Sequence, residues 1–553
     1  MASKEVLVKT LRNADGKSFQ KYRALEGFFD LDDFTLFFDD IQNDPSGYSR
    51  MRVRVPLSRS GFPQDAYSCA PRKTALRDLI ARRFWESTRV HAKSPVPGAS
   101  GGEISVPRPG QEILDRGTAV LTPYYIEVRF RAVLPSAGKT VPFRAAEEMI
   151  FGRLASIVRE SMFFGAYKQS KVYGHVITAE NADSIRSRLG GMGLVSFVAC
   201  GSILPRREDG LAPLSGAVPF DAPADTVISI DVPNGEPVRG LGIPEGLTIV
   251  CGGSGHGKSS FLEAILAGVY DHIPEDGREF VITRPDAVMI RREEGRSASG
   301  VDVSRFVRRC RECPDPSSFT AERTSSAMSQ AVAASEAIES GSGLLLLDEN
   351  TSEPSVIASG SAKSLLIPAG SEPFIPIIQS IPSSGGPSAI AVTSSTEAIE
   401  SADRVIVIDG FVAAGVQERE RDSPPSKPSV PDRYPMAHNI VFSKGRKEVH
   451  VCPSGTRSLE VGTDSVRVPS AALFDTAQTA LLADALSACR EMADGSRTLR
   501  SLVEEAVSGA IARAVSCESG PDAAYARPED LAAVLNRTPR LVAIRKRSRR
   551  EQL

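Results

Sequence analysis

The sequence lacks any long apolar run. No stretch of about 18 apolar residues occurs in its 553 residues, so no transmembrane helix is expected. The segment from Met1 to Val6 shows neither a secretory apolar region nor an Arg-rich transit peptide. We therefore expect an intracellular protein and assign it to the cytoplasm, while the organelle stays open.

The chain also has little net charge and few cysteines. Its formal net charge is −2, which argues against a general polyanion-binding protein. Eight cysteines at irregular spacing suit a reducing compartment. Cys310 and Cys313 form a C-x-x-C pair, but no second pair or nearby His stands at ligand spacing. Zinc or redox chemistry there is therefore disfavoured.

A complete G-x-x-x-x-G-K-[ST] phosphate loop follows a strand-like run, 246–251, and precedes a helix-like run, 260–266. Such a loop turns backbone N–H groups toward phosphate oxygens, and the helix N-terminus adds favourable charge. Lys258 is expected to reach the β- and γ-phosphates, and the Ser259 hydroxyl to ligate Mg²⁺. The predicted nucleotide-binding residues here are Gly252, Gly253, Ser254, Gly255, His256, Gly257, Lys258, Ser259 and Ser260.

An acidic pair completes this site. Four leucines, 344–347, predict a buried parallel strand that delivers Asp348 to the sheet edge where the phosphate loop lies. Asp348 is then a Walker B residue that holds Mg²⁺ through water. Glu349 is placed to polarise an attacking water, so Glu349 and Lys258 are the predicted catalytic residues.

A signature loop of the ATP-binding-cassette type is predicted ahead of this strand. Lys258 and Asp348 stand about ninety residues apart, as in cassette proteins. Between them, a turn of small residues, 325–330, leads into a helical segment, 331–338. Ser329 and Gln330 are predicted to serve the nucleotide of a second subunit, because a helix N-terminus there would face its γ-phosphate.

Longer motifs extend the likeness over the whole chain. They are Gly242–Gly246, Gly268–Val281, Glu294–Ser297, Gly300–Ser304 and Asp348–Ser352 in the middle, Asp33–Phe37, Gln42–Pro45, Arg52–Pro56, Arg108–Glu112 and Ile203–Arg206 before it, and Ala526–Pro528 with Val534–Arg537 after it. With them the sequence resembles the predicted ATPases of the ABC class, soluble proteins with a cassette core and no transporter subunit. The resemblance implies ATP and Mg²⁺ as cofactors.

Several residues depart from the family pattern. Ala327 replaces a Ser, Asn350 replaces an acid, and Arg284 replaces an Asp. The segment 351–388 holds ten Ser and six Pro where an Arg/Asp-rich helix is expected. Thr393, Ser394 and Ser395 follow the next strand where a transporter cassette has a switch His. ATP binding is therefore predicted, with slow turnover.

The predicted fold is α/β, with a P-loop ABC-type ATPase core flanked by an amino-terminal α/β domain and a mainly helical carboxyl-terminal region. The boundaries are 1–235 for the amino-terminal domain, 236–412 for the core, 413–437 for a Ser/Pro-rich linker and 438–553 for the remainder with a basic tail. Strands are predicted at 50–55 and 125–130, and helices at 145–162, 471–492 and 501–516.

Basic residues gather in two places outside the core. One cluster is Arg50, Arg52, Arg54, Arg59, Arg72, Lys73, Arg77, Arg82 and Arg83, and the other is Arg537, Arg540, Arg545, Lys546, Arg547, Arg549 and Arg550. Alternation places the first three arginines on one strand face. Such clusters are commonly solvated faces, but they also suit phosphate contacts with a nucleic acid.

Three hypotheses follow for function. The first is an Mg²⁺-dependent ATPase that acts as a homodimer, since one cassette per chain needs a second chain to supply the signature loop. The second is an ATP-gated scaffold with vestigial hydrolysis. The third makes RNA the partner, because some eukaryotic members of the family it resembles are associated with organellar RNA processing. His256 and His272 are expected to make hydrogen bonds or packing contacts rather than to act as bases.

Overall fold

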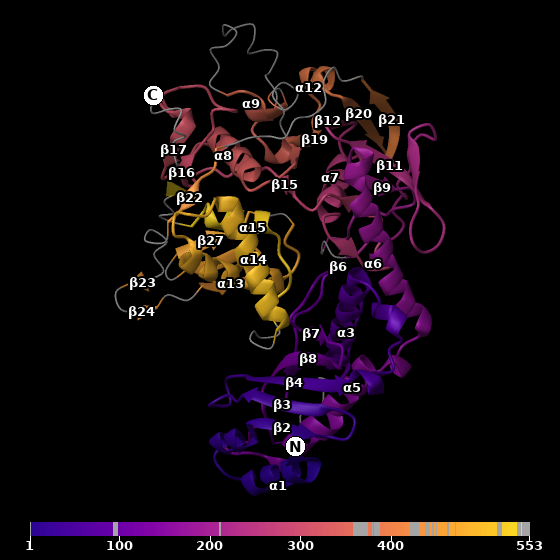
Figure 1. The fold of residues 1–553 in the computed structure, drawn as a ribbon, viewed down its shortest axis with the longest axis vertical. Coiled ribbons are helices and arrows are strands. Elements are labelled where there is room, and N and C mark those ends of the chain that lie inside the picture. The colour runs from indigo at the N-terminus through magenta and orange to yellow at the C-terminus, as the bar shows by residue number, and fades with distance from the viewer. Residues whose placement is uncertain are drawn as a thin grey trace. The chain divides into compact units, whose positions relative to one another are not determined.

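The computed structural model describes residues 2–91, 98–208, 212–357, 374–378, 380, 387–419, 431–436, 443–444, 447–448, 451–461, 464–469, 472–516, 522–538 and 543–544. Two compact units divide the chain (Figure 1). Unit 1 comprises Met1–Glu180, Asp475–Leu481 and Ile511–Tyr525; unit 2 comprises Asn181–Phe474, Leu482–Ala510 and Ala526–Leu553. The predicted boundaries at 235, 412 and 437 stay predictions. Residues 420–430 of the linker, and 358–373 and 381–386 of the Ser/Pro-rich segment, lie outside the described residues.

Unit 1 is built on a mostly antiparallel sheet of order β1-β2-β3-β4-β8-β5, with β7 paired to β8. Its strands are β1 Ala2–Ser3, β2 Gly27–Asp30, β3 Thr35–Asp40, β4 Ser49–Pro56, β5 Ile104–Ser105, β7 Ala119–Leu121 and β8 Tyr125–Ala132. In β4, Met51, Val53 and Val55 are buried while the alternating arginines face outward, as predicted. Phe84 of α3 (Ala70–His91) packs against Phe130 of β8, with 5.7 Å between the ring centroids, so α3 covers one face of the sheet.

The helices of unit 1 include the one predicted over 145–162. It forms as α4 Phe143–Glu147, a π-helical segment η3 Glu148–Leu154 and α5 Ala155–Met162 in continuous succession. The others are α1 Lys4–Ala14, η1 Phe19–Leu25, α2 Leu57–Ser60, η2 Gln64–Tyr67 and η4 Phe164–Ala166, and α6 Gln169–Leu189 begins in unit 1.

Carboxyl-terminal residues complete unit 1. Arg129 of β8 donates to the carbonyls of Ala514 and Val515, at 2.6 and 3.1 Å. Arg116 is buried and pairs with Asp78 at 3.2 Å and with Asp475 at 2.5 Å. A buried arginine needs such partners, because desolvating an unpaired charge is costly. Unit 1 therefore includes two carboxyl-terminal segments that lie outside the predicted amino-terminal domain, 1–235.

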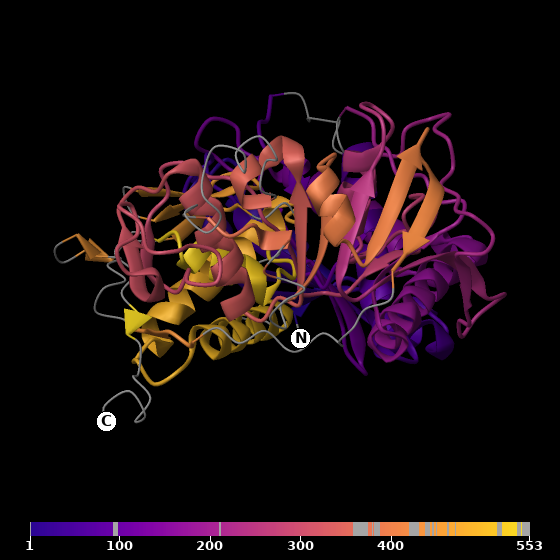
Figure 2. The ribbon, with the colours of Figure 1, turned by 90° about the horizontal axis from the view of Figure 1, so that it is seen from above.

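Unit 2 contains a six-stranded sheet of order β15-β18-β19-β12-β20-β21. Its neighbouring strands run parallel except β21, which is antiparallel to β20; these two strands are the orange arrows of opposite direction in Figure 2. The strands are β12 Leu247–Cys251, β15 Ala287–Met289, β18 Leu344–Asp348, β19 Ser388–Val392, β20 Arg404–Asp409 and β21 Val412–Glu418. The strands β18, β19 and β12 are buried along nearly their whole length, as expected for a parallel sheet covered on both faces.

Two helices cover this sheet. α8 (Ser326–Glu339) packs Met328 and Val332 into one core cluster with Leu345 and Leu347 of β18. α7 (Lys258–Ala267) contacts β18 and β19 without joining that cluster. Because alternate strand residues face opposite sides, α7 and α8 lie on opposite faces. Shorter elements nearby are η6 Pro316–Ser318, β16 Ala298–Val301, β17 Phe319–Ala321, η7 Glu349–Thr351, α9 Pro354–Ile357 and α12 Thr396–Ser401.

A second, antiparallel sheet of order β10-β11-β9-β14 lies in the same unit. Its strands are β9 Leu194–Ala199, β10 Val227–Ile230, β11 Val238–Pro244 and β14 Val281–Thr283. The carboxyl-terminal region is helical, as predicted, with α13 Thr476–Met492, α14 Leu499–Val515 and α15 Pro528–Leu535. It also holds a small antiparallel sheet that sequence reasoning missed, β25 Val451–Pro453, β26 Ser458–Val461 and β27 Asp464–Arg467.

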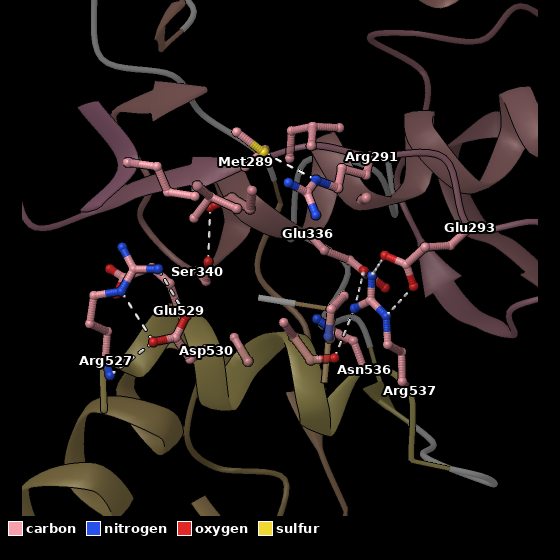
Figure 3. Close-up of a pocket in the computed structure, with 18 residues that line it drawn as sticks. Met289, Arg291, Glu293, Glu336, Ser340, Arg527, Glu529, Asp530, Asn536 and Arg537 are labelled. Carbon is pink, nitrogen blue, oxygen red and sulfur yellow. Dashed lines mark hydrogen bonds and ion pairs between the residues drawn. The ribbon is translucent and has the colours of Figure 1, made fainter. Parts of the chain in front are cut away.

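Buried ion pairs flank α15 in unit 2 (Figure 3). Arg527 pairs with Asp530 at 2.8 Å and donates to the carbonyl of Ala287 at 2.6 Å, so it joins α15 to β15. Arg537 pairs with Glu293 at 2.7 Å. Arg433, which is fully buried, pairs with Glu339 at the end of α8. Arg537 also lies 3.9 Å from Glu336 of α8, so these contacts join α15 and its flanking residues to β15 and α8.

A carboxyl group between these pairs sets a testable pH dependence. Glu529 lines a cavity beside α8 whose walls combine apolar and charged side chains. Burial raises the pKa of Glu529 to about 7, with Asp530 and Asp286 adding to the effect and the charge of Arg527 opposing it. Because the folded protein holds this proton more tightly than the unfolded chain, the stabilisation is complete below about pH 4.5 and is lost as the pH rises through 7. We predict that Glu529→Gln is more stable than the wild type at pH 8, by on the order of 2 kcal/mol.

Thermal unfolding midpoints at pH 5 and pH 8 measure this difference. The midpoint of Glu529→Gln should exceed that of the wild type by more at pH 8 than at pH 5. The matched control is Glu400→Gln, which neutralises an exposed carboxylate in the same unit. A difference that stays constant with pH would show that Glu529 ionises normally.

Candidate nucleotide-binding site

The phosphate loop lies between β12 and α7, at the carboxyl edge of the parallel sheet. Gly252 has φ of 141°, and a Cβ there would lie 2.1 Å from the carbonyl oxygen of Ile408. Gly257 has φ of 100°, and its Cβ would meet the ring of Phe411 at 2.4 Å. Only glycine fits either position, so the loop can turn sharply into α7 and present its N–H groups.

Seven of the predicted binding residues line one pocket with the predicted catalytic acid, Glu349. The pocket is lined by Gly253, Ser254, Gly255, Gly257, Lys258, Ser259, Ser260, Glu349, Asn350 and Phe411. Lys258 Nζ donates to the carbonyls of Gly252 and Gly253, at 2.8 and 3.0 Å. The ammonium group is therefore held over the loop, in reach of an anion that the loop would cradle.

The two Walker B acids differ in their surroundings. Asp348 is buried at the end of β18, and its Oδ1 accepts a hydrogen bond from the N–H of Asn350 at 2.9 Å. Glu349 is half-buried, and its Oε2 accepts from the N–H of Ser394 at 2.9 Å and from the Ser394 hydroxyl at 3.2 Å. Ser394 thus fixes the carboxylate of Glu349, whereas sequence reasoning noted only that the segment 393–395 lacks a His.

The oxygen donors at this edge suit Mg²⁺. Mg²⁺ prefers hard oxygen ligands and usually takes only one or two from protein, with the rest from water and phosphate. The Ser259 hydroxyl and the Asp348 carboxylate provide this number, and no described donor is bonded to Oδ2 of Asp348. Among the described residues, no group of three or more His, Cys, Asp or Glu side chains could hold a metal ion without a nucleotide.

Arg291 is a cationic group near Asp348 that sequence reasoning missed. It follows β15, whose register with β18 places residue 291 opposite the end of that strand. Burial lowers the pKa of Arg291, the neighbouring Arg457 lowers it further, and the carboxylate of Asp348 acts in the opposite direction. Arginine stays charged at neutral pH, so this group adds positive charge beside the Walker B acid. No local signal in the sequence separates it from other arginines.

The predicted signature residues lie at the start of α8. Ser325 caps the helix and accepts a hydrogen bond from the N–H of Met328. Ser329 and Gln330 are fully buried: the hydroxyl of Ser329 donates to the Ser326 carbonyl, and Gln330 Oε1 accepts from the N–H of Glu353. These two side chains support the helix end from within. Within the turn 325–330, Ser325 is exposed, and Ser326 and Ala327 are half-buried. Their service to a second subunit's nucleotide stays a prediction.

Neither notable histidine is placed as a general base. His256 Nδ1 lies 2.6 Å from Oδ1 of Asp409. His272 is buried, with Nδ1 at 2.8 Å from Asp276 and Nε2 at 3.2 Å from the carbonyl of Ala267. Both make the hydrogen-bonding contacts expected from the sequence.

The C-x-x-C pair forms part of the core beside α8 rather than a reactive site. The N–H of Cys310 donates to the carbonyl of Cys313 at 2.9 Å. Cys313 is buried, and burial raises its thiol pKa to about 11. A thiol with so high a pKa is a poor nucleophile at neutral pH.

Most of the amino-terminal basic cluster is neutralised within unit 1. Arg52 and Arg54 both pair with the buried Glu127, at 3.1 and 2.7 Å, and Arg50 pairs with Asp40 at 3.3 Å. Others in ion pairs are Arg72, Arg77, Arg82 and Arg83. The predicted strand geometry is confirmed, but its positive charge is compensated. In the carboxyl-terminal cluster, Arg537 is paired with Glu293, and residues 540 and 545–550 lie outside the described residues.

No helix in the described ranges is long and apolar enough to cross a membrane. This finding agrees with the absence of a long apolar run from the sequence.

Comparison with known proteins found one curated relative. The chain is 30% identical to an uncharacterized protein of Methanocaldococcus jannaschii over 245 residues, which are 42% of this chain and 54% of that protein. The chain thus spans about half the length of this curated relative.

Among solved structures, a bacterial Atm1-family ABC exporter with ATP bound is 11% identical, with 50% of this chain and 45% of that chain covered, at a TM-score of 0.26. A dimeric ATP-binding cassette in a post-hydrolysis state bound to ADP and Pi is 13% identical. The match covers 41% of this chain and 100% of that chain, at a TM-score of 0.24.

Two family models match successive parts of the chain. Residues 4–165 match the model described as the N-terminal part of the ATPases of the ABC class, and residues 168–441 match the model of their P-loop domain. The second span contains the phosphate loop, both Walker B acids and α8. With the phosphate loop and these acids lining one edge of a parallel sheet, the chain belongs to the ATPases of the ABC class.

Proposed function

We propose that this P-loop ATPase binds ATP with Mg²⁺ and hydrolyses it slowly as a homodimer. The observation that carries the proposal is the pocket that Lys258, Ser259 and Glu349 line together. It combines a cradle for phosphates, a cation and a carboxylate that can orient water. These are the parts that phosphoryl transfer to water needs, since its catalysis is mainly positioning and charge stabilisation.

The contacts of the residues support the following proposed roles. Lys258 would bind the β- and γ-phosphates, while Ser259 and Asp348 would hold Mg²⁺. The metal ion, when bound, neutralises charge on the phosphate oxygens. Glu349 would orient the attacking water through the carboxylate oxygen that Ser394 does not occupy.

Slow turnover is supported by two of these positions. Ser394 donates to Glu349, but a hydroxyl does not exchange a proton near neutral pH as an imidazole does. Ala327 leaves the exposed start of α8 without a hydroxyl ligand at that position. Both changes remove transition-state contacts and leave the binding cradle intact. An ATP-gated scaffold with vestigial hydrolysis is the limiting case of this behaviour.

The position of α8 supports the proposed dimer. A short connection joins the end of α8 to β18, so α8 runs antiparallel to that strand and begins at the same sheet edge as the phosphate loop. Within one chain, however, α8 packs on β18, and β19 separates that strand from β12, which carries the loop. A second copy facing this edge would bring each α8 to the other copy's nucleotide.

Removal of the loop cation tests nucleotide binding. We predict that Lys258→Ala weakens ATP binding by at least about a hundredfold, because phosphate charge in the cradle loses its main compensation. Isothermal titration calorimetry measures the affinity, and Lys171→Ala, which removes an exposed lysine in unit 1, is the control. Equal ATP affinity in wild type and Lys258→Ala would refute the assignment of this loop.

Replacement of the catalytic carboxylate tests hydrolysis and the dimer together. We predict that Glu349→Gln lowers ATP turnover by about a hundredfold or more while ATP stays bound, because the amide keeps the shape but cannot accept a proton. Light scattering with Mg-ATP should show a dimer at least as abundant as in the wild type. Glu400→Gln is the control for loss of one carboxylate. A variant that remains monomeric in saturating ATP would contradict the two-subunit arrangement.

RNA binding, if it occurs, should depend on the carboxyl-terminal tail rather than on β4. The arginines of β4 are compensated by Glu127 and Asp40, whereas the tail carries Arg545, Lys546, Arg547, Arg549 and Arg550. We predict weak RNA binding that falls roughly tenfold or more between low and physiological salt, since phosphate contacts release counterions. Fluorescence anisotropy with single-stranded RNA measures it. Unchanged binding after charge reversal of these five residues would end the RNA hypothesis for the tail.

A further inference from the structure

The turn between β20 and β21 lies directly against the phosphate loop. It consists of Asp409, Gly410 and Phe411, about 150 residues further along the chain than the loop itself. The roles proposed above for nucleotide binding and hydrolysis use none of the three residues. Nevertheless Phe411 lines the same pocket as Lys258 and Glu349.

Two hydrogen bonds connect this turn to His256 in the loop. Nδ1 of the imidazole lies 2.6 Å from Oδ1 of Asp409, and the N–H of Phe411 donates to the His256 carbonyl at 2.9 Å. The imidazole in turn lies against Gly253, where an added Cβ would be 2.8 Å from the ring carbon Cδ2. Asp409 therefore orients a ring that limits how far the glycine backbone beside it can move.

The ring of Phe411 makes a further contact, at the cost of an unfavourable backbone conformation. Phe411 has φ of 71°, one of three positive φ values among non-glycine residues of the described chain. Such a conformation costs on the order of 1 kcal/mol for an L-residue with a bulky side chain. Its ring lies so close to Gly257 that a Cβ there would be 2.4 Å away. The strained conformation thus places an aromatic ring against the residue that precedes Lys258.

We propose that Asp409 and Phe411 are positioning residues that hold the phosphate loop in its anion-binding shape before nucleotide arrives. The inference rests on the proposed ATP binding and adds residues that set its affinity. The loop contains four glycines between positions 252 and 257, and glycine loses the most conformational freedom when it is ordered. Contacts that order the loop in advance reduce the entropy lost on binding and so strengthen binding.

The location of these contacts predicts an effect on binding rather than on folding or chemistry. The side chains of His256 and Asp409 are 45% and 67% exposed, and an exposed ion pair contributes little to global stability. Neither Asp409 nor Phe411 contacts Glu349 or Ser394 through a hydrogen bond among the described residues. Loss of the contacts should therefore raise KM for ATP and leave kcat nearly unchanged.

Variants at Asp409 separate the hydrogen bond from the charge. We predict that Asp409→Ala weakens ATP binding about tenfold in calorimetry, while Asp409→Asn, whose amide oxygen still accepts from the imidazole, stays within about twofold of the wild type. Asp225→Ala removes an exposed acid elsewhere in unit 2 and is the control. Wild-type affinity in Asp409→Ala, or equal losses in the Ala and Asn variants, would overturn the positioning role of this hydrogen bond.

Variants at Phe411 separate the ring from the backbone. Phe411→Gly relieves the positive φ and removes the ring, so we predict an unchanged or higher unfolding midpoint together with about tenfold weaker ATP binding. Phe411→Tyr retains the ring and should bind ATP like the wild type. Wild-type affinity in Phe411→Gly would overturn the role of the ring, as would a lower kcat without a change in KM.

Hydrogen exchange without nucleotide provides a direct readout of the loop. The amides of residues 252–258 should exchange faster in Asp409→Ala and in Phe411→Gly than in the wild type, while the amides of α8 should not change. Unaltered exchange in the loop would overturn the inference even if affinity fell. If the wild type itself binds no ATP, both the proposed function and this inference are wrong. If it binds ATP and all the variants do so equally, only the inference is wrong.

Discussion

Close approach of backbone segments at Gly252 is the constraint on which the nucleotide site depends. The α-carbon of this residue faces the carbonyl oxygen of Ile408 so closely that no side chain could be accommodated. The approach brings the end of β12 beside the end of β20, and it positions the turn into α7. Without it, the phosphate loop and the β20–β21 turn would not meet, and the contacts of His256 and Gly257 with that turn would be lost.

The strand order of the parallel sheet brings the other side chains of the site to the phosphate loop. Because β12 lies between β19 and β20, its carboxyl end is flanked by Ser394 on one side and by Asp409 on the other. The next strand, β18, contributes Asp348 and Glu349 at the same edge. The side chains needed for phosphate, metal and water thus come from strands far apart in sequence, as is general for ligand sites of open α/β sheets. Polar side chains can be accommodated at this edge because they lie where the strands end, next to solvent, rather than within the apolar core.

Away from the site, arginine side chains join segments that are far apart in the sequence. Arg433, Arg527 and Arg537 tie the carboxyl-terminal region to α8 and β15, while Arg116 and Arg129 bring two other carboxyl-terminal segments into unit 1. Each guanidinium has carboxylate or carbonyl partners, so desolvation is offset in the native arrangement. Loss of one partner would leave a buried charge uncompensated. A different packing of these segments would therefore be costly, so the contacts favour the native one. The sequence shows the arginines but not their partners.

The sequence by itself determined the parts of the site that are local. The spacing of Gly252, Gly257 and Lys258, the apolar run ahead of Asp348, and the alternation in β4 each require only neighbouring residues, so the loop, β18 and β4 were predictable. Tertiary structure alone decided what depends on strand order and distant contacts. It assigned Ser394 to Glu349 and Asp409 to His256, buried Ser329 and Gln330, and compensated Arg52 and Arg54 with Glu127. The physical reason is that a hydrogen bond or an ion pair needs its two groups close together in space. Residues 45 to 153 positions apart in the sequence come that close only when the sheets have formed.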